Sequence, residues 1–328
     1  MERRDLTESQ AQAAAAAIVQ GAATPAQIAA LLVALRMKGE TVAEITGFAR
    51  AMRAAAVPTP IPCDDLVDTC GTGGDGAQTF NISTCAAIVA AAVGCHVAKH
   101  GNRAISSRCG SADVLCELGV NIDAPPEVAA RCVEHAGVGF LFAPRLHPGM
   151  KHAAGPRREL AARSIFNLLG PLTNPAGARR QVVGVYNKEW TEPLAEVLGR
   201  LGAVHCLVVH GSDGLDEITT TGSTRVSELR DGGVRTYELH PHDVGLETAA
   251  AKDLVGGDAA TNARIVRAVL SGEPGAARDV VALNAGAVAY VAGKAQSIAQ
   301  GVALACEAMD SGAAARTLSE LVRVSNEG

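Results

Sequence analysis

The chain has 328 residues, of which 48% are hydrophobic and 19% charged, a length typical of about two domains that each bury a core. This length and composition exclude global disorder and a mini-protein that depends on disulfides. The formal net charge of −5 argues against a protein that wraps nucleic acid. Aromatic residues make up only 3%, with a single Trp, so we expect a core of Ala, Val, Leu and Ile.

The nine cysteines are scattered singly, and none forms a Cys-x-x-Cys pair. Their odd number, and an N-terminus without the apolar core of a signal peptide, indicate reduced thiols in a cytoplasmic protein. We assign no chemistry to them. No apolar run approaches the roughly 20 residues that cross a bilayer, so no membrane partner is expected.

The first sixty residues carry three helix start signals. Thr7–Gln10, Thr24–Gln27 and Thr41–Glu44 each match a capping box that opens an Ala- and Leu-rich run. The proline-rich segment Pro58–Pro62 cannot continue a helix and is typical of a linker. The pattern predicts an N-terminal helical domain over residues 1–62.

From Leu66 onward, short β-type runs alternate with helical patterns. Strands are expected at 66–69, 95–98, 182–186, 204–209 and 236–239, and helices at about 83–93 and 111–118. This alternation predicts an α/β fold with a mostly parallel central sheet. Residues 150–169 also look helical. We expect the insertion at approximately 149–176 to join the helical domain, which leaves 63–148 and 177–328 as the α/β domain.

The most informative motif is the glycine-rich run Asp68–Gly76 at the end of the first expected strand. Its glycines allow successive N–H groups to converge on an anion. The segment Phe80–Thr84 then opens a helix whose free N–H groups favour negative charge. Together they suit a phosphate, although a flexible turn with an ordinary N-cap is the alternative. The run matches neither a Walker loop nor a dinucleotide fingerprint.

A similar loop follows about thirty residues later. Lys99–Arg103 follows a strand, and Ser106–Ser107 and Gly110–Asp113 lead into the next helix. Two anion sites on consecutive βα units suit a ligand with two separated phosphate groups, with a point charge from the lysine and hydroxyls from Ser107 and Ser111. His100 is either a ligand contact or a hydrogen-bonded structural histidine.

Two weaker features carry charge. The adjacent Asp216 and Glu217, in a glycine-rich turn after an apolar run, form either a Mg²⁺ site or a solvated acidic turn, and nothing in the spacing selects Asp213 as well. Arg157 or Arg158 in the inserted segment could bind a carboxylate. The spacing does not choose between the two arginines.

These motifs resemble the anthranilate phosphoribosyltransferase family from about Thr7 to the C-terminus. The resemblance rests on Gly71–Asp75, Asn81–Thr84, Lys99–Arg103, Ile165–Pro175 and Asp216–Glu217. It implies transfer of the 5-phosphoribosyl group from 5-phosphoribosyl 1-diphosphate to anthranilate, the second step from chorismate in tryptophan biosynthesis. It also implies an active site between the two domains, two Mg²⁺ ions per subunit, and a homodimer formed through the helical domains.

The resemblance further implies roles for individual residues. The donor should contact Gly71, Gly74, Asp75, Thr79, Asn81, Ile82, Ser83, Thr84, Lys99, His100, Gly101, Asn102, Arg103, Ala104, Ile105, Ser106, Ser107 and Ser111. Anthranilate should contact Gly71, Asn102 and Arg157. Ser83 and Glu217 should hold one Mg²⁺, and Asp216 and Glu217 the second. His100 should accept a proton or orient the amine.

Some positions depart from the family pattern. Ala161 stands where the family usually has Gly, and Gly149 where Ala is usual. The chain also begins close to the Thr7 cap, so the first helix should be shorter than in the family. A pyrimidine nucleoside phosphorylase and a non-catalytic nucleic-acid-binding member of the fold are the alternatives. The negative charge opposes the second, and the Asp216–Glu217 pair opposes both.

Overall fold

The N-terminal segment is helical, as the capping boxes predict. The computed structural model describes residues 3–104 and 108–327, and its first helices are α1 (Glu8–Val19), α2 (Pro25–Lys38) and α3 (Val42–Ala55). The side chains of Thr7, Thr24 and Thr41 each accept from the third backbone N–H of their helix, and a Gln or Glu side chain returns to the cap. All three predicted boxes are confirmed.

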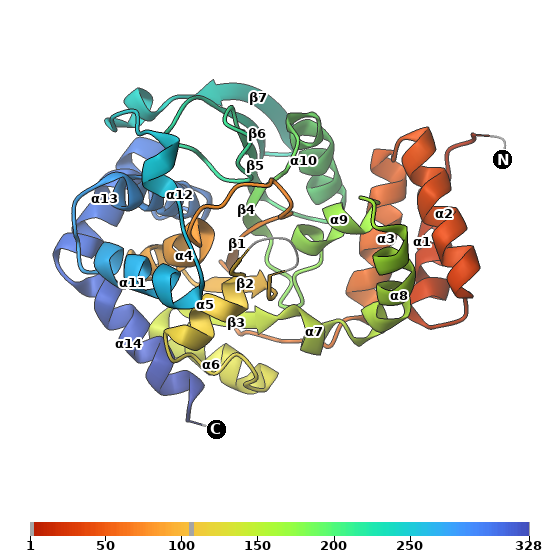
Figure 1. Ribbon diagram of the computed structural model, residues 1–328, viewed down its shortest axis with the longest axis horizontal. Helices are drawn as coiled ribbons and strands as arrows, with labels where there is room; N and C mark the ends of the chain where they lie inside the picture. Colours follow the sequence, from red (N-terminus) through yellow and green to blue (C-terminus); the bar gives the residue numbers. More distant parts are fainter. Residues whose placement is uncertain (1–2, 105–107, 328) are drawn as a thin grey trace.

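These helices form a bundle at one end of the molecule (Figure 1). Its core contains Ile18, Ile28 and Phe48, which are fully buried. Helix α8 (Lys151–Leu160), distant in sequence, packs against α1 and α2. This is the arrangement expected for the inserted segment, although the domain boundaries themselves stay a prediction.

Residues 150–169, which look helical in the sequence, are largely helical, but the helix is interrupted between Leu160 and Phe166. The inserted segment consists of η1 (Pro148–Met150), α8, α9 (Phe166–Leu169) and η2 (Gly170–Leu172). Helix α8 ends because Ala161 adopts the left-handed conformation, with φ 48°. Glycine enters that region without a Cβ penalty, which accounts for the glycine usual here in the family.

The α/β part is built on a seven-stranded sheet with the order β3-β2-β1-β4-β5-β6-β7. The strands are β1 (Val67–Gly71), β2 (Val97–Gly101), β3 (Val138–Phe142), β4 (Arg180–Gly184), β5 (His205–Gly211), β6 (Thr224–Arg230) and β7 (Gly233–Leu239). The five strands from β3 to β5 are parallel, and only β6 and β7 are antiparallel. The predicted fold class is confirmed, and β3 and β6 are strands that the sequence reasoning missed.

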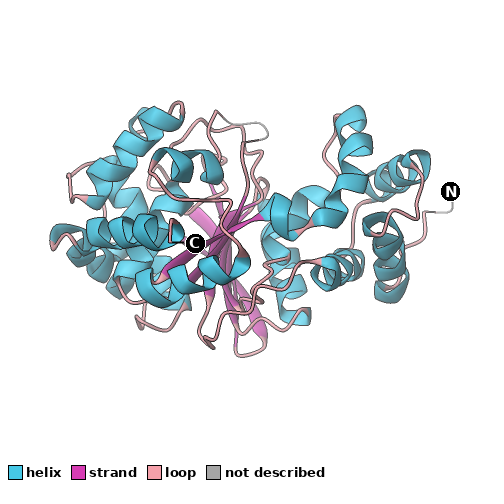
Figure 2. Ribbon diagram, turned by 90° about the horizontal axis from the view of Figure 1, so that it is seen from below, coloured by secondary structure: helices cyan, strands magenta, loops and turns pink. Residues whose placement is uncertain are grey.

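Both faces of the central strands are covered. Val182 and Leu207 belong to the core beneath α4 (Ile82–Ala92) and α12 (Ala276–Val291), whereas Val183 joins the opposite core with α10 (Thr191–Arg200). This alternation follows from the two-residue period of a strand. Helix α10 also contacts α3, so it connects the sheet to the bundle. Figure 2 shows helices on both sides of the strands.

The remaining helices complete the covering layers. They are α5 (Ser111–Glu117), α6 (Pro126–Ala136), α7 (Ala143–Leu146), α11 (Ala259–Leu270), α13 (Ile298–Asp310), α14 (Ala313–Ser325), and the short η3 (Lys188–Trp190), η4 (Pro241–Val244) and η5 (Ala251–Leu254). Within the described residues, no helix is both long and apolar enough to cross a membrane. Each of the nine cysteines is a free thiol.

The sheet topology indicates where a ligand should bind. From β1 the chain adds β2 and β3 on one side, and β4 and β5 then extend the sheet on the other. In open parallel sheets, ligands bind at the carboxyl ends of the strands, where the strand order reverses. Here that point lies between Gly71, at the end of β1, and Gly184, at the end of β4.

Candidate active site

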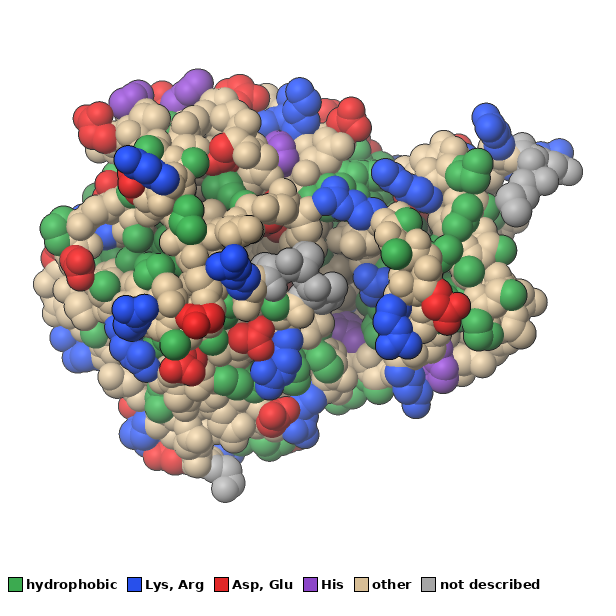
Figure 3. Space-filling model, in the orientation of Figure 1, with side chains coloured by type: hydrophobic (Ala, Val, Ile, Leu, Met, Phe, Trp, Pro, Cys, Tyr) green, Lys and Arg blue, Asp and Glu red, His purple; other side chains and the backbone are tan. Residues whose placement is uncertain are grey.

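A cavity of about 480 Å³ lies beside this reversal point, between the helical bundle and the sheet. Its size is within the range of small-molecule sites. Its lining is largely apolar on the bundle side, from Met52, Met150 and Phe166, and polar on the sheet side, where His100 and Asn102 reach it. Figure 3 shows the molecule hollowed between the two parts, with Lys and Arg side chains at the margin.

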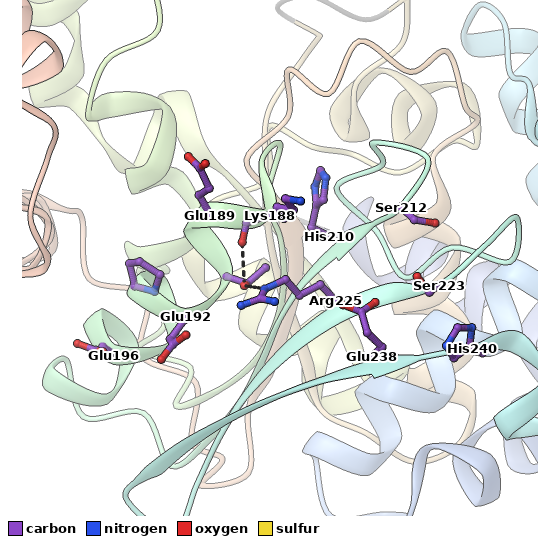
Figure 4. A pocket seen from close by; sticks show the side chains of 12 residues that line it. Lys188, Glu189, Glu192, Glu196, His210, Ser212, Ser223, Arg225, Glu238 and His240 are labelled. Atoms are coloured by element: carbon purple, nitrogen blue, oxygen red, sulfur yellow. Dashed lines mark hydrogen bonds between the residues drawn. The ribbon is translucent and has the colours of Figure 1, made fainter.

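A larger concavity of about 930 Å³ lies elsewhere, over α10, β6 and β7. Figure 4 shows its charged side chains spread around an open depression, among them Glu192, Glu196 and Arg225. Arg225 Nε donates to Thr191 Oγ1 at 3.2 Å. None of the site residues expected from the sequence lines this depression, so the smaller cavity is the candidate active site.

Two glycines allow the acidic turn to approach the strand ends closely. Gly73 N–H donates to Asp216 Oδ2 at 2.7 Å. A Cβ on Gly71 would lie 2.2 Å from Asp216 Oδ2, and one on Gly184 would lie 1.5 Å from the carbonyl oxygen of Asp216. Side chains at these positions are therefore incompatible with the observed path of the acidic turn.

The second carboxylate, Glu217, reaches the start of α4. Ser83 N–H donates to Glu217 Oε1 at 3.1 Å. The buried ammonium of Lys99 donates to Ser83 Oγ at 3.2 Å and to the carbonyl of Thr69 at 2.6 Å. The first turn of α4 was expected to face a phosphate. In this structure one of its N–H groups instead donates to the carboxylate of Glu217. The predicted metal residues Ser83, Asp216 and Glu217 therefore lie together.

The charges in this group are incompletely balanced. Burial raises the pKa of Asp216 well above its usual range, and the nearby negative charges of Asp75 and Glu217 raise it further. Burial also raises the pKa of Glu217 to about 7, against the opposing effect of Lys99. Buried oxygen ligands with surplus negative charge fit a Mg²⁺ ion. Asp213, the candidate left open above, instead accepts hydrogen bonds from Thr219 Oγ1 at 2.6 Å, from the Thr221 hydroxyl and from the Leu215 N–H at 3.2 Å.

The second predicted anion loop is organised by Asp113, which the sequence analysis named as part of the loop without giving it a role. Asp113 Oδ2 accepts from the backbone N–H groups of Ala104 and Gly110 at 3.0 and 2.9 Å, and its Oδ1 accepts from Arg103 at 2.9 Å. Asp113 lies in the first turn of α5, which begins at Ser111, and thus closes the loop at its base. The expected contacts Ile105, Ser106 and Ser107 lie outside the described residues.

Other predicted donor contacts have structural partners. Asn81 Nδ2 donates to the carbonyl of Cys109 at 3.1 Å, and its Oδ1 accepts from Asn262 at 2.9 Å. Thr79 forms an isolated bridge with Val255. The side chains of Ile82 and Thr84 are buried in α4. Gly74 and Asp75 belong to the glycine-rich loop, and Gly101 lines the cavity.

His100 is held with one ring nitrogen directed at a carbonyl. Its Nδ1 lies 3.2 Å from the Gly170 carbonyl oxygen, which only accepts, so Nδ1 carries the proton and Nε2 is a free acceptor. Burial, with a smaller effect from His147, lowers the pKa of His100 to about 3. His147 was not predicted, yet its ring centroid lies 5.1 Å from that of His100. The Nε2 atoms of both rings are buried without a hydrogen-bond partner among the described residues.

The choice between the two arginines follows from their positions on α8. Arg157 lines the cavity, with its guanidinium carbon 5.3 Å from the Phe166 ring centroid, whereas Arg158 is exposed. Burial lowers the pKa of Arg157. No carboxylate among the described residues pairs with Arg157. The guanidinium is therefore available to a carboxylate ligand, and Asn102 lies at the same cavity.

Another contact joins the inserted segment to the glycine-rich loop. Arg163, in the turn after α8, donates to the carbonyl of Gly74 in the glycine-rich loop. Its guanidinium carbon also lies 4.2 Å from the ring centroid of Tyr186. No pattern in the sequence predicts this contact, because the three residues are far apart in the chain.

Comparisons with known proteins agree with this geometry. Residues 63–315 match the glycosyl transferase family, a/b domain, and residues 1–56 match the helical bundle domain of that family. The fold and site thus define a glycosyl transferase that pairs a helical bundle with an α/β domain. The anthranilate phosphoribosyltransferase of Moorella thermoacetica is 58% identical over 97% of this chain and 94% of its own length.

Solved structures extend the comparison. Anthranilate phosphoribosyltransferase from Thermus thermophilus superimposes with a TM-score of 0.94 at 49% identity, covering 98% of this chain and 97% of its own. The Saccharomyces cerevisiae enzyme in complex with PRPP and Mg has a TM-score of 0.89 at 27% identity, covering 98% and 94%. This chain belongs to the anthranilate phosphoribosyltransferase family. The phosphorylase and nucleic-acid-binding alternatives are not favoured.

Proposed function

We propose that this chain transfers the 5-phosphoribosyl group of 5-phosphoribosyl 1-diphosphate to the amine of anthranilate. The products are N-(5-phosphoribosyl)anthranilate and diphosphate, in the second step from chorismate in tryptophan biosynthesis. The observation that carries the proposal is a pairing of opposite charges at one cavity. The half-buried carboxylates Asp216 and Glu217 lie on the sheet side, with Asp216 directly against the lining residue Gly71, and Arg157 lines the bundle side without a carboxylate partner among the described residues.

The sheet side suits the donor. Lys99 uses two of its three N–H donors on Thr69 and Ser83, which leaves one for a phosphate oxygen. Ser83, Asp216 and Glu217 would hold Mg²⁺, and we retain two ions per subunit as the expectation. Bound Mg²⁺ offsets the negative charge of the departing diphosphate. The glycine-rich loop and the loop closed by Asp113 position the two phosphate-bearing ends.

The bundle side suits the acceptor. Arg157 is placed to pair with the anthranilate carboxylate, with Asn102 and the backbone at Gly71 near the ring. His100 Nε2 is placed to accept a hydrogen bond from the amine. Because the pKa of His100 lies near 3, this nitrogen is a weak base, so its main role is orientation. The aromatic amine is a neutral nucleophile and needs no strong base.

We also propose that the protein is a cytoplasmic homodimer that pairs through the bundle. Val33 and Met37, four residues apart on α2, are 39% and 72% exposed. Residues spaced by four lie on one helix face, so these side chains form part of an apolar surface that a second copy would cover. Light scattering tests this proposal: the mass of two chains is expected, and Met37→Glu should shift it toward one.

The decisive assay follows the loss of anthranilate fluorescence after addition of 5-phosphoribosyl 1-diphosphate and Mg²⁺. We expect loss of signal only when both are present. An unchanged signal, together with phosphorolysis of thymidine, would contradict the proposal and indicate a pyrimidine nucleoside phosphorylase.

A further inference from the structure

A group of three potential metal ligands lies at the amino ends of the strands, whereas the active site lies at their carboxyl ends. Cys63 comes from the linker after α3, Asp65 from the turn before β1, and His96 from the residue before β2. Their ligand atoms all lie within 4.8 Å of one another. Strands β1 and β2 are parallel, with Val67 paired to Val97, so their amino ends bring Asp65 and His96 side by side.

Contacts inside this group already bring the three potential metal-ligand atoms close together. Asp65 Oδ1 accepts from Cys63 Sγ at 2.8 Å and lies 2.7 Å from His96 Nδ1. A tetrahedral metal with bonds of about 2.0–2.3 Å holds its ligand atoms roughly 3–4 Å apart. Small side-chain movements would therefore convert the hydrogen-bonded group into a coordination shell, with the fourth position open to water.

We propose that Cys63, Asp65 and His96 bind one divalent cation of the zinc class. Thiolate, imidazole and carboxylate together favour such a metal, whereas the all-oxygen group of the active site favours Mg²⁺. One thiolate and one carboxylate also balance the charge of a dication. The site is distinct from the catalytic one, because the length of β1, about 3.3 Å per residue, separates the two ends.

The surroundings explain how the group persists without a metal. Burial alone would raise the pKa of Asp65, but hydrogen bonds from Cys63, His96 and Lys294 outweigh it and hold that pKa well below its usual range. These contacts thus favour the anionic carboxylate. Lys294 Nζ lies 3.1 Å from Asp65 Oδ2, which leaves Oδ1 for a metal but places a competing positive charge nearby.

The thiol must lose its proton for this metal to bind. Burial, together with its hydrogen bond to Asp65, raises the pKa of Cys63 to about 11. Binding of the metal therefore releases this proton. An ion in this position would cross-link the linker that leaves the bundle to the first two strands of the sheet.

Equilibrium dialysis of the full chain against Zn²⁺ tests the proposal. Excess Mg²⁺ and 5-phosphoribosyl 1-diphosphate are kept present to occupy the active-site carboxylates. We expect one Zn²⁺ per chain. Since loss of second-shell partners alone costs about 10–100-fold, Cys63→Ser and His96→Gln should each weaken binding at least about tenfold. Cys116→Ser and His135→Gln, at exposed positions elsewhere, should leave it unchanged.

Replacing the competing lysine should change the Zn²⁺ affinity in the opposite direction. Lys294→Met removes the positive charge beside Asp65 and should tighten Zn²⁺ binding. Affinity unchanged in Cys63→Ser, affinity not improved in Lys294→Met, or no Zn²⁺ bound by the wild-type chain would overturn the proposal.

A measurement on the unmodified protein avoids any folding defect of the variants. Zn²⁺ should protect Cys63 from alkylation, and a peptide map should show no such protection of Cys116. Co²⁺ in place of Zn²⁺ should give a thiolate-to-metal absorption band. Alkylation of Cys63 at the same rate with and without Zn²⁺ contradicts the site.

Discussion

The active-site cavity has two walls that differ in charge: a sheet wall, formed by the ends of the strands, and a bundle wall, formed by the helical part. Directly behind the lining residue Gly71, the sheet wall gathers Asp216, Glu217 and Lys99 with backbone donors, and it is left with surplus negative charge. The bundle wall is mainly apolar and presents Arg157, a guanidinium without a carboxylate partner among the described residues. Under the proposed function, this contrast separates the substrates: a magnesium-bound polyphosphate on one wall, and a small aromatic carboxylate on the other.

The largest effect should come from the sheet wall. Replacing both carboxylates, Asp216→Asn with Glu217→Gln, should lower kcat/KM by at least about 10³-fold, because two metal ligands are lost. The free energy of unfolding should not fall, because two buried like charges are removed. Steady-state kinetics at saturating Mg²⁺ and denaturant unfolding measure the two quantities.

Asp213→Asn is the control for this experiment, since it lies in the same turn but is engaged with Thr219 and Thr221. Its effect on kcat/KM should be far smaller. A double variant with normal rates at saturating Mg²⁺ would mean that the metal assignment is incorrect.

The bundle wall should respond through one substrate only. Arg157→Gln should raise KM for anthranilate about tenfold to a hundredfold, as expected for a lost charged hydrogen bond worth about 1.5–3 kcal/mol. KM for the donor should stay unchanged. Arg158→Gln, one residue further along α8, is the matched control. Equal changes in both KM values would contradict the proposal that each wall binds a different substrate.

His100 belongs to β2 and lies where the walls meet, with its Nδ1 against the Gly170 carbonyl oxygen. His100→Ala should lower kcat about tenfold, less than the roughly 10²–10⁴-fold typical of general bases. His100→Gln should recover part of this loss by restoring an acceptor. The pH profile of kcat should show no step from this residue near neutrality, because the pKa of His100 is about 3.

The same shift fixes the sign of the stability effect of His100. Its pKa is lower in the folded protein than in the unfolded chain, so the folded state binds fewer protons between these values. The contribution of this residue to stability is thus present above the unfolded pKa of about 6.5 and declines as the pH falls toward 3. Denaturant unfolding at several pH values should show a smaller acid loss in His100→Gln; an identical loss contradicts the assignment.

The smallest effect concerns the scaffold of the bundle wall. Ala161 carries a left-handed φ of 48° at the end of α8. Ala161→Gly should raise the free energy of unfolding by about 1 kcal/mol, because glycine avoids the Cβ penalty. Ala162→Gly, at the next position, should lower it. If both variants change stability in the same direction, backbone strain at Ala161 is not the cause.

Local signals were sufficient to predict much of this molecule. The three capping boxes depend on residues three apart, and the glycine-rich run marks the end of β1 directly. The sequence did not reveal β6, whose residues from Thr224 to Arg230 include several charged side chains. It also missed the break at Ala161, because alanine ordinarily continues a helix.

The parts of the site that were missed depend on distant contacts. Asp113 closes a loop whose far end is nine residues earlier, and Asn262 reaches Asn81 across 181 positions. No motif or spacing in the sequence singled out His147. Arg157 could not be separated from Arg158 by spacing, because their different surroundings arise from how α8 packs on α1 and α2.

The contact from Arg163 to Gly74 gives this chain a built-in optical reporter. The guanidinium of Arg163 lies over the ring of Tyr186, and Tyr186 and Trp190 pack against the same hydrophobic core. That indole is the only tryptophan in the sequence. A donor that displaces Arg163 from the glycine-rich loop would therefore change the emission of a single residue. Occupation of the sheet wall can thus be followed without any label, separately from the signal of anthranilate itself.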